Sequence, residues 1–162
     1  MTTIAFDGIT LATDRASWNG WTWVAVEKLS VFELGVAARK HSGVDIKGLV
    51  AYAGAGDGKY ILELCEWLKG ARAVLPTVPG DSAMGILVDS RGHAFEVTTN
   101  GMLMELINLP VVSGGGGDIA LGAMLYGASA VRAVELTSER SQYSAGGISE
   151  ISVSDLSGDL SS

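Results

Sequence analysis

The sequence predicts an α+β protein in which two antiparallel sheets lie between outer helices, a four-layer αββα sandwich. Short strands come in runs and are joined by glycine-containing turns, which is typical of antiparallel hairpins rather than parallel βαβ units. Helical periodicity interrupts these runs, so the order is strands, helix, strands, two helices and a closing strand. The 162 residues fit a single domain, which we place at 1–153, followed by a polar, acidic C-terminal tail at 154–162.

The first third of the chain consists of strands joined by turns. Asp-Gly and Asn-Gly dipeptides stand at positions 7–8 and 19–20, and such residues readily adopt the positive φ that a tight hairpin requires. A polar turn, HSGVD, separates two further apolar segments. The predicted strands are Thr2–Phe6, Ile9–Ala12, Trp21–Val26, Leu29–Leu34 and Gly48–Ala53.

After residue 57 the apolar side chains follow a helical rather than a strand period. Residues 58–69 place them at i, i+3, i+4 and i+7, which is the stripe of an amphipathic helix. These side chains are Ile61, Leu64, Cys65 and Leu68. Pro76 and Pro79 lie in the following loop, since proline cannot continue a helix.

The second half repeats this alternation of strands and helices. Three strands are predicted at 83–88, 94–98 and 102–106, and a short one at 111–112. After SGGGGD a helical region spans 118–140, which Gly127 and Ser129 divide in two, with Ser129 capping the second helix. A strand at 148–153 closes the fold.

Charge and cysteine content exclude several partners. The formal net charge of −7 disfavours nucleic acid and anionic membranes. No apolar run reaches membrane-spanning length without a Gly, Asp or Arg, and the N-terminus lacks the order of a signal peptide. Cys65 is the sole cysteine, so no intrachain disulfide can form, and we expect a protein of the reducing cytoplasm.

Several kinds of active site are also excluded. With two histidines and one cysteine, a clustered zinc site is not expected, and we expect no cofactor. The G-x-S-x-G elbow of Ser-His-Asp hydrolases does not occur. GAGDGKY fails as a phosphate-binding Walker loop, because Ala53 and Tyr60 stand where glycine and Ser or Thr are required. Gly115, Gly117 and Ala120 fit G-x-G-x-x-A, but too little chain follows for a dinucleotide-binding unit.

The start of the chain, MTTIAFDG, offers a different chemistry. If Met1 is removed, Thr2 carries both a hydroxyl nucleophile and a free α-amine. Such an amine has an ordinary pKa of roughly 7.7–8.0, close to what a general base needs at neutral pH. A threonine activated by its own amine is a known nucleophile. The alternative is that Thr2 only begins an edge strand.

Taken together, several segments resemble the proteasome β-subunit and HslV-like family of N-terminal nucleophile (Ntn) hydrolases, including its small bacterial and phage members. The segments are TTIAFDGITLATD, EKL, AYAGAGD, SGGGGDIALGAM and the closing AGG with its strand. The resemblance implies an αββα fold and an N-terminal threonine peptidase that hydrolyses peptide bonds inside a homo-oligomeric ring. It also implies peptide or unfolded-protein substrates, which an AAA+ ATPase unfoldase could deliver.

The resemblance assigns catalytic roles to three polar residues. Thr2 matches the nucleophile, Asp14 in LATD the family aspartate, and Lys28 in EKL the catalytic lysine. An ammonium group near the α-amine would keep that amine unprotonated, and the Asp14 carboxylate would hold Lys28 charged and in place. The alternative for Asp14 and Lys28 is an ordinary surface ion pair.

The resemblance also assigns residues to the oxyanion hole and to substrate binding. Gly54 in AYAG matches the glycine whose backbone N–H stabilises the developing negative charge. Ser17 matches a residue that pairs with the substrate backbone, although its loop is one residue short. Tyr52 lines the pocket for the residue that precedes the cleaved bond.

The chain departs from the family pattern at three positions. Gly115 stands where the family has a serine that supports the terminal amine, and Ser113 could replace it only if the strand register shifts. Gln142 and Ala145 stand where many members have Asp and Ser. Low turnover is therefore expected.

Two alternatives remain open at this stage. One is a catalytically weak or inactive proteasome-like assembly protein, and the other is an Ntn amidase that acts on small amides. Trp18, Trp21 and Trp23 cluster near the hairpin at 19–20. They belong either to the core or to an interface between subunits.

Overall fold

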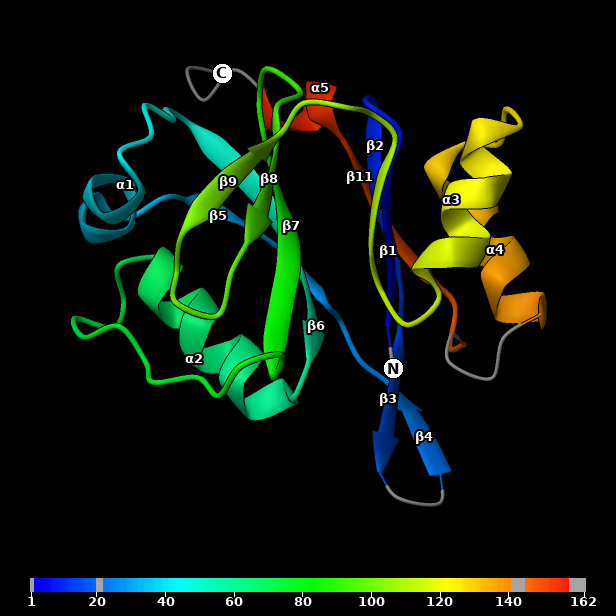
Figure 1. Ribbon diagram of the computed structural model, residues 1–162, viewed down its shortest axis with the longest axis horizontal. Helices are drawn as coiled ribbons and strands as arrows, with labels where there is room; N and C mark the ends of the chain where they lie inside the picture. Colours follow the sequence, from blue (N-terminus) through cyan, green and yellow to red (C-terminus); the bar gives the residue numbers. More distant parts are fainter. Residues whose placement is uncertain (1, 20–21, 141–144, 158–162) are drawn as a thin grey trace.

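The computed structural model describes residues 2–19, 22–140 and 145–157 of the chain. These residues form the predicted four-layer αββα sandwich (Figure 1). Helices α1 (Val36–Ser42) and α2 (Gly58–Leu68) cover one sheet, and α3 (Gly117–Leu125) and α4 (Ala130–Arg140) cover the other. None of the helices in these described ranges is long and apolar enough to span a membrane.

The first sheet holds the start of the chain at its centre. Its strands are β1 (Thr3–Phe6), β2 (Thr10–Asp14), β10 (Val111–Gly114) and β11 (Ile148–Ser152). They are antiparallel in the order β10-β1-β2-β11. Because Thr3 pairs with Gly114, the beginning of the chain lies beside the glycine-rich segment that precedes α3.

The second sheet is antiparallel in sequence order. Its strands are β5 (Leu29–Glu33), β6 (Leu49–Gly56), β7 (Ala83–Asp89), β8 (Ala94–Val97) and β9 (Leu103–Leu106). They confirm the strand pair predicted over 29–53 and the three strands predicted over 83–106.

A separate two-stranded hairpin extends from the sandwich near the N-terminus (Figure 1). It consists of β3 (Ala16–Asn19) and β4 (Thr22–Ala25). The strand predicted over 21–26 is thus confirmed for Thr22–Ala25, and Trp21 lies outside the described residues.

Two short helices differ from the prediction. Helix α1 lies partly where the sequence indicated a polar turn. The sequence did not predict this helix, because only Ala38 in it is buried and it has no apolar stripe. Gly43, with φ of 67°, ends this helix. Helix α5 (Val153–Leu156) lies at the start of the predicted tail. Its Leu156 is buried between the sheets, so the folded chain continues beyond the predicted boundary at residue 153.

The capping residues of the longer helices follow from the sequence. Asp57 Oδ1 accepts a hydrogen bond from Lys59 N at 2.9 Å at the start of α2. Ser129 Oγ accepts one from Arg132 N at 3.2 Å, which confirms the predicted cap of the helix after Gly127. Such caps satisfy backbone N–H groups that have no partner within the helix.

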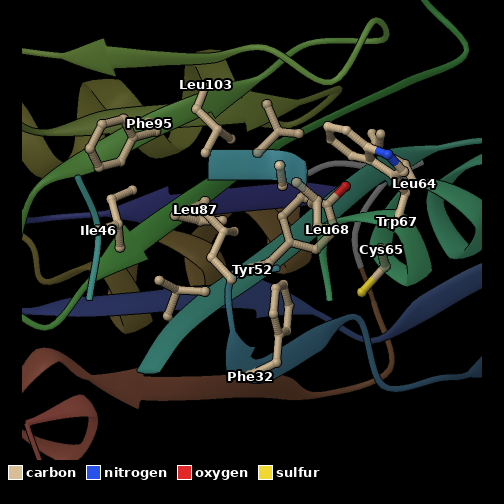
Figure 2. Close-up of a cluster of buried hydrophobic side chains, with 14 residues drawn as sticks. Phe32, Ile46, Tyr52, Leu64, Cys65, Trp67, Leu68, Leu87, Phe95 and Leu103 are labelled. Carbon is tan, nitrogen blue, oxygen red and sulfur yellow. The ribbon is translucent and has the colours of Figure 1, made fainter. Parts of the chain in front are cut away.

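Three apolar clusters hold the four layers together. The first, shown in Figure 2, lies between the second sheet and its helices, with Tyr52 and Leu87 from the sheet and Leu64 and Leu68 from α2. The second lies between the two sheets and the third between the first sheet and α3 and α4. Alternation along the strands explains this arrangement, since successive side chains point to opposite faces.

Candidate active site

Three polar residues meet where strands begin and end. Thr2 precedes β1, Asp14 ends β2 and Lys28 precedes β5. Lys28 Nζ donates a hydrogen bond to Thr2 Oγ1 at 2.8 Å and lies 3.2 Å and 3.3 Å from the two Asp14 carboxylate oxygens. Thr2 is 7% exposed and Asp14 is fully buried. The ion pair is therefore largely shielded from water, which is the opposite of an ordinary surface pair.

The Asp14 carboxylate is fixed by backbone donors as well as by lysine. Oδ1 accepts a hydrogen bond from Thr3 N at 2.8 Å, and Oδ2 accepts from Ala16 N at 3.1 Å and from Ala145 N at 3.4 Å. A buried carboxylate is tolerated only where such donors and a counter-ion replace water. Asp14 thus fixes the position of Lys28 beside Thr2.

The Lys28 ammonium group loses its proton more easily than that of a lysine in water. Burial lowers the pKa of the Lys28 amine, and the Asp14 carboxylate raises it by less, so the pKa lies below its ordinary value. Asp14 therefore holds Lys28 in place, but its charge does not fully offset the effect of burial on the pKa of Lys28. A lysine of this kind exchanges protons with a neighbouring hydroxyl more readily than a solvated one.

A cavity of about 650 Å³ opens beside Thr2 and Lys28. Ser17, Tyr52 and Gly54 all lie in its wall. The structure therefore brings Thr2, Lys28 and the three residues assigned to the oxyanion hole and to substrate binding to one cavity, with Asp14 behind Lys28.

Gly54 occupies a position where a side chain has no room. A Cβ at this residue would lie 2.5 Å from Ile61 Cγ2 and 2.8 Å from the Tyr52 hydroxyl oxygen. The pairing of β5 with β6 begins at Leu29 and Ala53, so β5 does not extend along Gly54. Gly54 is thus a point where another chain can approach the backbone of β6 closely.

Helix α2 supplies much of the cavity wall that the sequence analysis did not assign. Ile61, Leu62 and Cys65 line the cavity, and Trp18 of the hairpin lines it too. The signal was present in the apolar stripe of the helix, which includes Ile61 and Cys65, but periodicity does not say whether a stripe faces core or cavity. Burial raises the pKa of the Cys65 thiol, which disfavours its reactive thiolate form.

The glycine-rich segment lies against the first residues of the chain. Gly114, with φ of 88°, pairs with Thr3, and Gly116 N-caps α3. A Cβ at Gly116 would collide with the Thr3 hydroxyl, whereas Gly115 is exposed. Of the other two positions that depart from the family pattern, Ala145 contacts Asp14 through its backbone N–H. Gln142 lies outside the described residues.

Comparisons with known proteins give a likeness of structure alone. No family model and no curated protein sequence matches the chain. BPH of Thiobacillus denitrificans in complex with epoxomicin is 18% identical with a TM-score of 0.59, over 93% of this chain and 96% of that one. Eukaryotic HslV from Trypanosoma brucei is 16% identical with a TM-score of 0.62, over 94% and 98%.

A third solved structure extends the likeness. Anbu, an ancestral beta-subunit from Yersinia bercovieri, is 10% identical with a TM-score of 0.67, over 94% of this chain and 81% of that one. Identities this low carry information about the fold only. The chain therefore has the proteasome- and HslV-like αββα sandwich that its sequence pattern predicts.

Proposed function

We propose that the protein is an N-terminal threonine peptidase in which Thr2 is the nucleophile once Met1 has been removed. The observation that carries this proposal is the position of Lys28, whose Nζ hydrogen-bonds to Thr2 Oγ1 and pairs with buried Asp14 at the edge of a cavity. A nucleophile, a proton acceptor and a group that orients it are the minimum for covalent catalysis.

The proposed reaction divides peptide hydrolysis into two steps. Thr2 Oγ1 attacks the carbonyl carbon while its proton passes to the free α-amine, which the neighbouring Lys28 ammonium keeps unprotonated. The Oγ–C bond forms, the C–N bond breaks, and the proton leaves with the new amine. Water then hydrolyses the ester, which restores the hydroxyl of Thr2.

Gly54 and the cavity provide the remaining parts of the proposed site. The backbone N–H of Gly54 stabilises the negative charge that develops on the carbonyl oxygen. Ser17 binds the backbone of the substrate, and the cavity takes the side chain that precedes the cleaved bond. Its volume is within the range of ordinary ligand pockets.

The substrates that we propose are peptides or unfolded proteins, and the working form is a homo-oligomeric ring in the cytoplasm. The hairpin of β3 and β4 supports assembly, because it extends from the sandwich as a separate pair of strands and such a pair is marginally stable without a partner surface. A ring would keep folded proteins away from the site, and an AAA+ ATPase could supply unfolded chains.

A weak or inactive assembly protein is the second candidate, and one observation favours it. Gly115 brings no hydroxyl to the turn that lies beside the first residues of the chain. Intact mass measurement of the purified protein separates the candidates at their first step. Loss of one methionine residue supports the peptidase, and a retained Met1 contradicts it because the α-amine of Thr2 would be blocked.

A further inference from the structure

One buried polar atom in the wall of the cavity has no hydrogen-bond partner. Among the described residues two buried side-chain oxygens are without one, Thr3 Oγ1 and the hydroxyl of Tyr52; of these residues Tyr52, which is 1% exposed, lines the cavity. Two other polar groups of the same wall are paired: Lys28 with Thr2 and Asp14, and Asp57 with Lys59 N. Buried polar groups are nearly always satisfied, so an exception indicates a role.

The place of this hydroxyl follows from the glycines around it. The position of a Cβ on Gly54 is 2.8 Å from the Tyr52 oxygen and 2.5 Å from Ile61 Cγ2. Both Gly54 and Ile61 line the cavity. The hydroxyl therefore lies between β6 and α2 at the inner wall, among the side chains of α2 that Figure 2 draws around Tyr52.

The orientation of the ring is fixed by the sequence. Gly54 pairs with Gly85 across β6 and β7, and a Cβ on Gly85 would lie 2.6 Å from Tyr52 Cε2. Two facing glycines thus leave room for the ring to lie along the sheet. Larger residues at either position would push the hydroxyl out of the cavity wall.

The chemistry of the wall limits what the hydroxyl can bind. A phenol both donates and accepts hydrogen bonds, and burial raises the pKa of Tyr52, so the group is neutral. Apart from Lys28, the charged residues that line the cavity are exposed: Glu27, Asp57 and Lys69. A charged side chain that reached the buried hydroxyl beside Ile61 would therefore lose its hydration, which is unfavourable. A neutral amide or hydroxyl would give the phenol a hydrogen-bond partner and would gain one for itself.

We propose that the Tyr52 hydroxyl selects the substrate side chain that enters the cavity, and that this side chain is uncharged and ends in a hydrogen-bonding group, as glutamine does. This inference rests on the proposed function, since the cavity must receive the residue that precedes the cleaved bond. It identifies Tyr52 as a specificity-determining residue and names the class of peptide that the site prefers.

Two fluorogenic peptides that differ in one residue test the inference. One has glutamine before the cleaved bond and the other has norleucine, which is similar in length but apolar. We expect kcat/KM to favour the glutamine peptide by about tenfold, a ratio typical of one buried hydrogen bond. In Tyr52→Phe the ratio should fall close to one, and in the control Tyr126→Phe, at an exposed tyrosine, it should stay at the wild-type value.

A binding measurement keeps this test independent of turnover. Calorimetry on the Thr2→Ala protein should give the same preference for the glutamine peptide, and Thr2→Ala/Tyr52→Phe should lose it. If binding keeps this pattern while the wild type cleaves neither peptide, the proposed function fails and the inference stands. An equal ratio with Tyr and Phe at residue 52, or no binding of either peptide to Thr2→Ala, overturns the inference.

Discussion

Lys28 is the residue on which the chemistry of the site depends most directly. Its Nζ lies 2.8 Å from Thr2 Oγ1 and 3.2 Å from an Asp14 oxygen. An ammonium at this position lowers the pKa of a nearby α-amine, because two positive charges close together repel. Proton transfer by a positioned base typically contributes a factor of roughly 10²–10⁴ to rate.

Replacing this lysine should change both the rate and its pH dependence. We expect Lys28→Ala to lower kcat/KM by at least about 100-fold. The rising limb of the pH–rate profile should move to higher pH, because the α-amine loses its positive neighbour and gains protons more easily. The control is Lys40→Ala on the exposed side of α1. An unchanged pH profile for Lys28→Ala, in a protein that still folds, would contradict the claim that Lys28 lowers the pKa of the α-amine.

Gly115 and Gly116 are adjacent, but they should respond very differently to serine. Gly115 is exposed, and the positive φ belongs to Gly114 instead. We expect Gly115→Ser to be tolerated and to raise kcat several-fold by placing a hydroxyl near the terminal amine. Gly116→Ser should destabilise the fold, because a Cβ there collides with Thr3 Oγ1 and Thr137 Cγ2.

Peptide turnover and thermal unfolding of the two variants check this pair. If Gly115→Ser folds normally and turnover stays flat, the alignment of SGGGGD with the family serine is wrong, or water already supplies the missing hydrogen bond. A Gly116→Ser protein with wild-type Tm would contradict the close contact with Thr3.

At the scale of elements, Asp7 joins the turn between β1 and β2 to the start of α4. Its Oδ1 accepts hydrogen bonds from Ile9 N at 2.9 Å and Thr10 N at 2.8 Å, and Oδ2 accepts from Ala130 N at 2.8 Å. Partial burial raises the pKa of Asp7, but these donors together lower it by more, so it lies below 3.8. A carboxylate at a helix N-terminus is also favoured by the helix dipole.

Asp7→Asn should therefore destabilise the protein at neutral pH. The amide cannot accept from all three donors, and we expect a loss of about 1 kcal/mol, a low value because water screens this partly exposed group. A lowered pKa means that the carboxylate stabilises the fold above 3.8 and loses this effect as pH falls through its folded-state pKa. The difference in free energy of unfolding between wild type and Asp7→Asn should thus become smaller at acid pH.

Urea unfolding at pH 7 and at a pH well below 3.8 measures the difference in free energy of unfolding between wild type and Asp7→Asn. Asp45→Asn, at an exposed position, is the control. If the difference in free energy of unfolding between wild type and Asp7→Asn stays constant with pH, the charge of Asp7 does not stabilise the fold.

The elements that could be predicted are those with strong local signals. Asp-Gly and Asn-Gly turns mark the hairpins at positions 7–8 and 19–20, and an apolar stripe marks α2. Helix α1 could not be predicted, since its seven residues bury only Ala38 and owe their conformation to packing. Helix α5 looks polar in sequence, and only the docking of Leu156 between the sheets explains it.

The site could be predicted in part. The proximity of Thr2, Asp14 and Lys28 was implied by resemblance and not by spacing, and the structure brings all three together. The unpartnered hydroxyl of Tyr52 could not be foreseen. It depends on how α2 packs on β6 and on a glycine pair between β6 and β7, and no local pattern encodes that geometry.

At the scale of the molecule, the two-stranded hairpin raises the question of assembly. An isolated pair of strands is marginally stable in water, and Trp18 and Val24 leave apolar surface exposed here. We expect a homo-oligomer of several subunits by light scattering after size exclusion. A stable, active monomer at micromolar concentration would contradict the ring.

The central claim is that Thr2 is the nucleophile, and its most direct test is the hydrolysis of fluorogenic peptides. The wild type and Thr2→Ala are compared once mass measurement has confirmed that Met1 is removed. Thr3→Ser is the matched control, because it keeps a hydroxyl on the neighbouring residue, whose backbone N–H holds Asp14. The account predicts turnover by the wild type and by Thr3→Ser, and none by a fully folded Thr2→Ala protein. Wild-type turnover by Thr2→Ala would contradict it.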